Sequence, residues 1–145
     1  MSQCATLRSD ALLLRLWGPA DHPTIFGWWR GHGATPPVVE ILPELGVIVE
    51  SVAGPIAGCW SYMDRSRSVA MICYPVTAPG LPGGLAWRAL SLAIEFLEEH
   101  LKAEGYTHVL AFVSRESLSR LLDRRGYQGT MTEHYQRVKP LWPQD

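Results

Sequence analysis

The order of apolar and polar positions predicts strands in the first half of the chain and one long helix in the second half. Over residues 85–104, charged side chains lie largely off a stripe that has the 3.6-residue spacing of a helix with one buried face. The stripe consists of Ala86, Leu90, Ala93, Ile94, Leu97 and Leu101. Gly105 then supplies the C-terminal stop. This pattern predicts an amphipathic helix.

Short apolar runs bounded by glycine, proline and polar residues predict strands over residues 11–17, 45–50, 56–63, 69–74 and 108–113. The turn at 53–55 and the polar loop at 64–68 favour an antiparallel meander for the middle three strands. Asp21 is a candidate cap for a short helix that starts near Pro23.

The last third of the chain predicts a short helix over residues 117–125, ended by Gly126, and then two short strands or one bent strand over 129–138. Residues 139–145 read as a C-terminal tail. We therefore expect a single α/β (α+β) domain over residues 1–145.

Composition and charge narrow the class of protein. The chain has 145 residues, 13 basic and 14 acidic side chains, and a formal net charge of −1. This balance argues against a nucleic-acid-binding protein, and no apolar run approaches the roughly 20 residues that span a bilayer. The three cysteines show neither disulfide nor zinc-site spacing. We therefore expect no metal, no membrane contact and a cytoplasmic location.

A glycine-rich turn precedes the long helix and is the first candidate for chemistry. Residues 76–86 read Val-Thr-Ala-Pro-Gly-Leu-Pro-Gly-Gly-Leu-Ala. Gly83 and Gly84 lack a Cβ, so a pyrophosphate could approach the backbone N–H groups at the start of the helix. A plain strand-to-helix turn is the alternative interpretation.

The order of elements and this turn resemble the GNAT superfamily of acyl-CoA-dependent N-acyltransferases. The family loop reads Gln/Arg-x-x-Gly-x-Gly/Ala after a strand ending in Val, and residues 81–86 match it at Gly84 and Ala86, with Val76 before. Residues 121–127, Leu-Leu-Asp-Arg-Arg-Gly-Tyr, resemble the family's Leu-Tyr-x-x-x-Gly-Phe. The resemblance covers roughly residues 45–138.

The resemblance implies a mixed, mostly antiparallel central sheet flanked by helices, and acetyl-CoA or another acyl-CoA as cofactor. The cofactor-binding residues that it implies are Val76, Gly83, Gly84, Leu85 and Ala86. Residues 42–49 resemble, more loosely, a strand of small GNAT-like proteins of phages and prophages.

Several positions depart from the family pattern. Leu81 stands where Gln or Arg is usual, and Pro82 offers no N–H. Leu122 stands in place of the tyrosine that often protonates the CoA thiolate, and Arg115 in place of a common asparagine. Two functions therefore stay open. One is acyl transfer to an unknown amine by direct attack; the other is an inactive, GNAT-fold binding or inhibitor module with a protein partner or as a homodimer.

Acyl transfer needs a base for the amine, a donor for the thiolate and N–H groups that polarise the carbonyl. Glu50 is the candidate base, with His108 and His134 as alternatives. The candidate proton donors are Tyr74, Ser114 and Tyr127. Backbone N–H groups near residues 74–76 are expected to face the carbonyl. Each of these side chains also has an ordinary structural interpretation. The same holds for Trp28, Trp29 and Trp60, which line either an acceptor pocket or the core, and Cys73 is expected to be an inert thiol.

Overall fold

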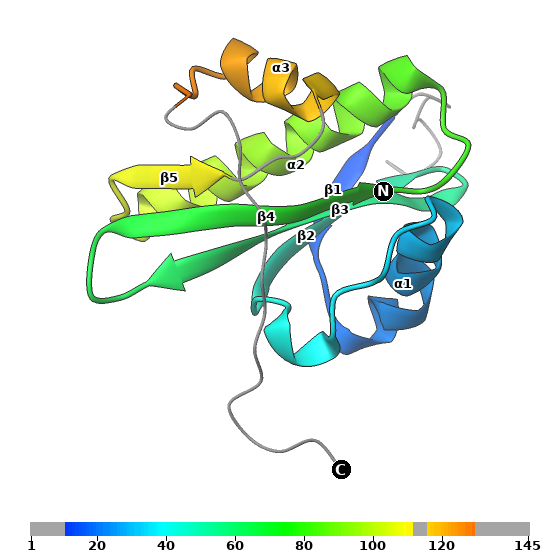
Figure 1. Ribbon diagram of the computed structural model, residues 1–145, viewed down its shortest axis with the longest axis horizontal. Helices are drawn as coiled ribbons and strands as arrows, with labels where there is room; N and C mark the ends of the chain where they lie inside the picture. The colour runs from blue at the N-terminus through cyan, green and yellow to red at the C-terminus, as the bar shows by residue number, and fades with distance from the viewer. Residues whose placement is uncertain (1–10, 112–115, 130–145) are drawn as a thin grey trace, which may run out of the picture. The chain divides into compact units, whose positions relative to one another are not determined.

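A computed structural model describes residues 11–111 and 116–129. Its sheet has five described strands in the order β1-β2-β3-β4-β5 (Figure 1). Neighbouring strands are antiparallel except β4 and β5, which are parallel. The strands are β1 (Leu13–Leu16), β2 (Leu45–Ser51), β3 (Gly54–Asp64), β4 (Val69–Thr77) and β5 (His108–Ala111). The predicted meander and the mixed, mostly antiparallel sheet are confirmed.

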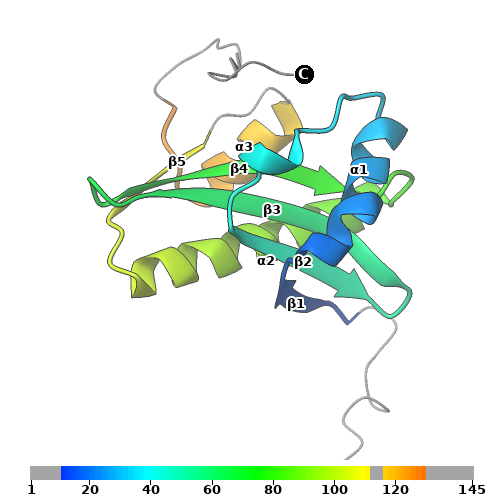
Figure 2. The ribbon, with the colours of Figure 1, turned by 90° about the horizontal axis from the view of Figure 1, so that it is seen from below.

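Two helices cover opposite faces of this sheet, α1 (His22–Gly31) and α2 (Gly83–Ala103) (Figures 1 and 2). Short 3₁₀ turns lie at Pro19–Asp21 and Val39–Ile41. Asp21 is the N-cap residue of α1 by position, but its side chain makes no cap hydrogen bond. The expected side-chain cap is therefore wrong, because that carboxylate binds Arg15 and the Gly18 N–H instead.

The face of α2 that the spacing predicts is the buried one. Its buried residues are Ala89, Leu90, Ala93, Ile94, Leu97 and Leu101, and α2 packs mainly on β2, β3 and β4. The helix ends where Gly105 adopts a φ of +92°, a conformation that favours glycine. Because side chains alternate between the two faces along a strand, the face covered by α2 also holds Val47, Val49 and Cys59.

The opposite face holds an aromatic core under α1. Its buried members are Ile25, Trp28, Leu42, Ile48, Trp60 and Val76. Trp60 has no exposed surface and Trp28 is 7% exposed, so both are core residues. Trp29 is half-buried, with its ring centroid 5.9 Å from that of Trp60.

β4 continues three residues beyond its expected end at Tyr74. Trp60 pairs with Cys73 and Gly58 pairs with Val76, so two residues of β4 lie opposite one residue of β3. This bulge accommodates Pro75, which cannot donate to a ladder, and lets the strand resume after it.

Contacts divide the chain into two compact units, Met1–Ala111 and Phe112–Asp145. In the second unit, α3 (Glu116–Arg124) forms close to the predicted place, and Gly126 follows it with a φ of +88°. The N–H groups of Gly126 and Tyr127 bind carbonyls of the last turn of α3. Ser114, His134, the strands expected over 129–138 past Gly129 and the tail at 139–145 lie outside the described residues.

Candidate active site

The turn between β4 and α2 presents backbone N–H groups at the start of a helix. Pro82 is the N-cap residue of α2, and no side chain caps this end. The first helical hydrogen bond runs from the Ala86 N–H to the Pro82 carbonyl at 3.0 Å. The N–H groups of Gly83, Gly84 and Leu85 therefore have no partner within the helix, which suits the turn to an anion.

The approach to these N–H groups is open. Gly83 and Gly84 are exposed, and a Cβ added at either position would meet nothing within 4 Å. The first turn of α2 contains no acidic residue, so the positive end of the helix dipole is not offset there. Four of the five residues expected to bind the cofactor, Gly83 to Ala86, thus lie in one turn, and the N–H groups of Gly83, Gly84 and Leu85 are the ones available to a phosphate.

β4 is distorted just before this turn. Tyr74, the first residue of the bulge, has a φ of 57°, which a residue with a side chain rarely adopts. Bulges with such backbone angles re-aim side chains and end strand pairing next to functional sites. The bulge is therefore the second feature of the candidate site.

Beyond the bulge, one edge of β4 has no described strand beside it. The described residues of β5 pair only with Val69–Ile72 of β4. The Ala78 N–H donates to the Ile56 carbonyl of β3 at 2.7 Å. Because the direction of N–H groups alternates along a strand, the N–H and C=O of Thr77 point away from β3. Val76, by contrast, turns its N–H toward β3, so Thr77 is the backbone donor on the open edge.

The residue that follows α1, His32, reaches this edge. Its Nε2 lies 2.8 Å from the Thr77 carbonyl oxygen. A Cβ on Gly31 would clash with the ring of Pro79, so glycine is needed where the end of α1 approaches the turn. Sequence reasoning missed His32. The local signal was a histidine between two glycines at the end of a helix, but its partner is 45 positions away.

Tyr74 is paired with a second tyrosine. Its hydroxyl lies 3.3 Å from that of Tyr62, which donates to the Ile41 carbonyl. The Tyr62 hydroxyl has one proton, and that proton is donated to Ile41. In the contact between the two tyrosines, the Tyr74 O–H is therefore the donor and the Tyr62 oxygen the acceptor. Burial and the bond with Tyr74 raise the pKa of Tyr62, which keeps this hydroxyl protonated. The role of Tyr74 as proton donor to a thiolate stays a prediction.

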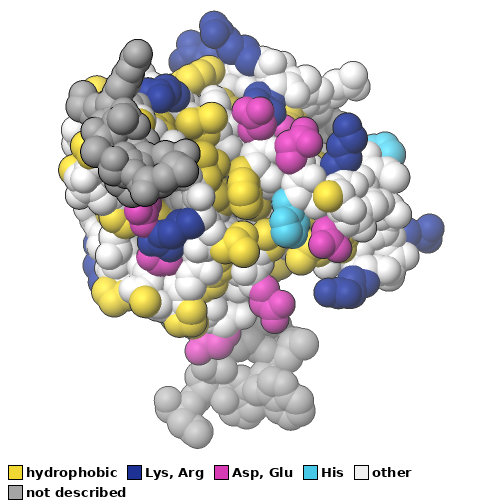
Figure 3. Space-filling model, turned by 180° about the vertical axis from the view of Figure 1, so that it is seen from behind, with side chains coloured by type: hydrophobic (Ala, Val, Ile, Leu, Met, Phe, Trp, Pro, Cys, Tyr) yellow, Lys and Arg dark blue, Asp and Glu magenta, His cyan; other side chains and the backbone are white. Residues whose placement is uncertain are grey.

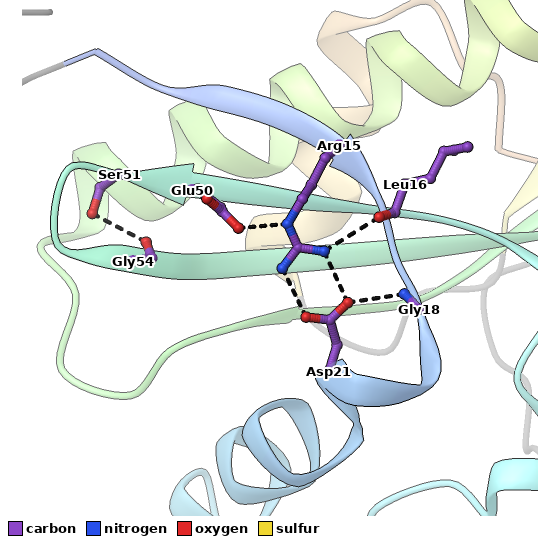
Figure 4. A network of polar contacts seen from close by, with 7 residues as sticks. All are labelled: Arg15, Leu16, Gly18, Asp21, Glu50, Ser51 and Gly54. Atoms are coloured by element: carbon purple, nitrogen blue, oxygen red, sulfur yellow. Dashed lines mark hydrogen bonds and ion pairs between the residues drawn. The ribbon is translucent and has the colours of Figure 1, made fainter. Parts of the chain in front are cut away.

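Glu50 lies on β2, with β3 between it and β4, which corresponds to about 10 Å between the two strands. Its Oε1 is 2.5 Å from Nε of Arg15, and Arg15 also makes two bonds to Asp21, at 2.9 and 2.7 Å (Figure 4). The side chain of Glu50 is thus held at β1 and β2 by an ion pair. The role of Glu50 as base also stays a prediction.

The two described thiols of this unit, those of Cys59 and Cys73, are not activated. Burial raises the pKa of Cys73 to about 12, and burial likewise raises the pKa of Cys59. Thiols with such values are not thiolates at neutral pH. Neither cysteine is therefore a candidate nucleophile.

A surface depression of about 370 Å³ lies at the other end of β4, between the β3–β4 hairpin and the C-terminal end of α2. Arg65, Arg67 and His100 line it together with Asp64 and Glu104. On the face in Figure 3, Lys and Arg side chains are interspersed with Asp and Glu around hydrophobic ones.

Over residues 11–111 and 116–129, no three His, Cys, Asp or Glu side chains are grouped as metal ligands. Within the same ranges, no helix has the length and apolarity to cross a membrane.

No family model matches this chain, and no curated protein matches its sequence. Solved structures do match it. An acetyltransferase of Trypanosoma brucei gives a TM-score of 0.64 at 17% identity, covering 88% of this chain and 100% of that one. The ribosomal-protein-S18-alanine N-acetyltransferase of Escherichia coli gives 0.70 at 15% identity, covering 83% and 80%. The chain has the GNAT acetyltransferase fold.

A third GNAT match was solved with coenzyme A. It is the N-acetylglutamate synthase of Neisseria gonorrhoeae, in complex with coenzyme A and N-acetyl-glutamate. The TM-score is 0.61 at 14% identity, and the match covers 79% of this chain but 28% of that one. The fold class expected from the sequence is thus confirmed, and the chain shares the GNAT fold with a protein that binds coenzyme A.

Proposed function

We propose that this protein is an acyl-CoA-dependent N-acyltransferase that moves an acetyl or other acyl group to an amine by direct attack. One observation carries the proposal: the free N–H groups at the start of α2 lie just after an open, bulged edge of β4. Solved acetyltransferases with the same fold, one of them complexed with coenzyme A, support it.

The residues present fit an acyl-CoA. The N–H groups of Gly83, Gly84 and Leu85 would hold the pyrophosphate, and the Thr77 N–H on the open edge of β4 would donate to an amide carbonyl of the pantetheine arm. Leu81 and Pro82 are compatible with this binding mode, because the proposed donors are backbone N–H groups of the residues that follow them. The thioester supplies an activated acyl group.

The side chains available to protonate the CoA thiolate differ from the usual family pattern. Leu122 is 7% exposed and has no exchangeable proton, so the thiolate must take its proton elsewhere. Tyr74 and Ser114 are the proposed donors, and Ser114 lies outside the described residues. No specific observation on residues 11–111 or 116–129 favours the alternative of an inactive binding module.

Calorimetric titration with acetyl-CoA tests the proposal. Wild-type protein should bind, and Gly84→Glu should weaken binding by ~10-fold or more, because a carboxylate beside a pyrophosphate adds like-charge repulsion. Position 84 has room for the side chain, so the fold should persist.

Gly27→Glu is the matched control for this titration. Gly27 is exposed on α1 and equally uncrowded, so that variant should bind acetyl-CoA like wild type. An absence of binding at millimolar acetyl-CoA, or an equal loss in both variants, would contradict the proposed function.

A further inference from the structure

We infer that His32 is the general base that removes a proton from the acceptor amine, an assignment that rests on the proposed function. The observation behind it is the hydrogen bond between Nε2 of His32 and the Thr77 carbonyl, 2.8 Å long, on the open edge of β4. The sequence indicates Glu50, His108 and His134 as candidates for this role, and the geometry favours a different residue.

The bond to Thr77 determines which imidazole nitrogen is basic. A carbonyl oxygen only accepts, so Nε2 of His32 is the protonated nitrogen. Nδ1 is then left with its lone pair, which is the form of histidine that accepts a proton. The hydrogen bond to the carbonyl also fixes the orientation of the imidazole ring. A general base needs this orientation as well as a basic nitrogen.

The bond to Thr77 also determines where this base lies. Thr77 is on the edge of β4 that faces away from β3, three residues after the distorted Tyr74 and six before Gly83. Val69, which pairs with His108, is at the far end of the same strand. Glu50 is two strands away and bound to Arg15. Of the described candidates, His32 is therefore the one that contacts the edge of β4 proposed to bind the acyl-CoA.

His32 contacts β4 at Thr77, and the neighbouring Gly31 approaches Pro79; residues 76–81 contain no ionisable side chain. Along the sequence, Arg30 is the charged residue of α1 closest to His32, and Tyr74 is the titratable residue of β4 closest to Thr77. His32 is exposed, so a proton that it accepts can pass to water.

In the proton step, an alkylammonium gives one N–H proton to Nδ1 of His32 and becomes a neutral amine. The nitrogen lone pair then forms the bond to the acyl carbon and the carbon–sulfur bond breaks. The thiolate that leaves takes a proton from the proposed donor, Tyr74 or Ser114, and the second proton of the amine restores that donor. The products are an amide, the CoA thiol and an imidazolium that returns its proton to water.

The tautomer is tested first, on the full chain without ligand. Long-range ¹H–¹⁵N spectra near pH 7.5 should show His32 with a proton on Nε2 and none on Nδ1. A spectrum with the proton on Nδ1 would overturn the assignment, independently of any activity.

The catalytic role is tested with acetyl-CoA and two amines, by following the CoA thiol that is released. His32→Gln keeps an N–H donor for Thr77 but has no basic nitrogen. With butylamine, which is protonated at neutral pH, its kcat should fall by ~10-fold or more while the KM for acetyl-CoA stays within about twofold. With aniline, which is uncharged at neutral pH, the loss should be smaller.

Two further variants separate a base from a structural residue. His32→Ala should lose the same activity and regain part of it when imidazole is added. His100→Gln, at the C-terminal end of α2, should match wild type. Equal rates in wild type and His32→Gln, or no transfer to either amine by protein that binds acetyl-CoA, would overturn the assignment of His32. Failure of wild type to bind acetyl-CoA would instead overturn the proposed function.

Discussion

Arg15 connects three parts of the chain at the scale of single residues. Its guanidinium joins β1 to Glu50 of β2 and to Asp21 at the start of α1. The hydrogen bond from Arg15 holds the pKa of Asp21 below its ordinary value of 3.8, and the same bond raises the pKa of Arg15. Because the Arg15 side chain is 41% exposed, water screens this network, and its contribution to stability is modest.

Replacing Asp21 with asparagine should lower the free energy of unfolding at pH 7 by about 1 kcal/mol. The native pKa of Asp21 is lower than the unfolded one, so its contribution is complete above about pH 4 and is lost as the pH falls through the native value. The difference between wild type and Asp21→Asn should therefore shrink as the pH falls below about 4. Urea unfolding at several pH values measures it.

Asp123→Asn is the control for that series, because Asp123 is exposed and has no such arginine bond among the described contacts. It should stay within ~0.5 kcal/mol of wild type. A pH-independent difference for Asp21→Asn would show that the network does not depend on the Asp21 charge.

The elements of this fold differ in how far local sequence predicts them. The stripe of apolar residues predicted α2, because helix periodicity is a local property. The end of β4 was predicted wrongly, since the bulge at Tyr74 and Pro75 depends on pairing with β3. The glycine turn was visible in the sequence for the same local reason as α2, whereas the contact from His32 to Thr77 depends on how α1 packs on the sheet.

One pair of residues shows this limit within the sheet. Gly46 of β2 pairs with Trp60 of β3, and a Cβ at position 46 would clash with the rings of Trp60 and Trp17. Gly46 is thus required by side chains far away in the sequence. No local pattern distinguishes it from a turn glycine.

Gly46→Ala should therefore destabilise the protein by about 1–3 kcal/mol, because the tryptophan rings must move out of a packed core. Thermal unfolding followed by tryptophan fluorescence measures the loss. Gly27→Ala is the control: it lies in α1 with open space around it, and should gain up to about 1 kcal/mol from helix propensity. A Gly46→Ala variant as stable as wild type would contradict the packing of Trp60 over Gly46.

At the scale of the whole molecule, the fold matches that of the solved acetyltransferases at TM-scores of 0.61–0.70, although the sequence identity is 14–17%. The open edge of β4, the glycine turn and His32 all belong to the unit Met1–Ala111. The candidate site thus has its own scaffold of β4, α1 and α2. Leu122 belongs to the second unit. By the resemblance, its position concerns proton transfer and not this scaffold.

Two regions of the first unit compete as ligand sites, and they lie at opposite ends of β4. One is the turn at Gly83 and Gly84, and the other is the depression lined by Arg65 and Arg67. The turn offers the positive end of a helix dipole, and the depression offers arginines beside Asp64 and Glu104. A measurement that reports position as well as affinity distinguishes them.

Amide chemical-shift mapping of the ¹⁵N-labelled protein during titration with acetyl-CoA is that measurement. We predict that the largest chemical-shift changes fall on Thr77 and on Gly83 to Ala86. The amide shifts of residues around Arg65 and Arg67 should change little. Shifts centred on the depression between the β3–β4 hairpin and the end of α2, or no shifts at millimolar acetyl-CoA, would contradict the proposed acyl-CoA site.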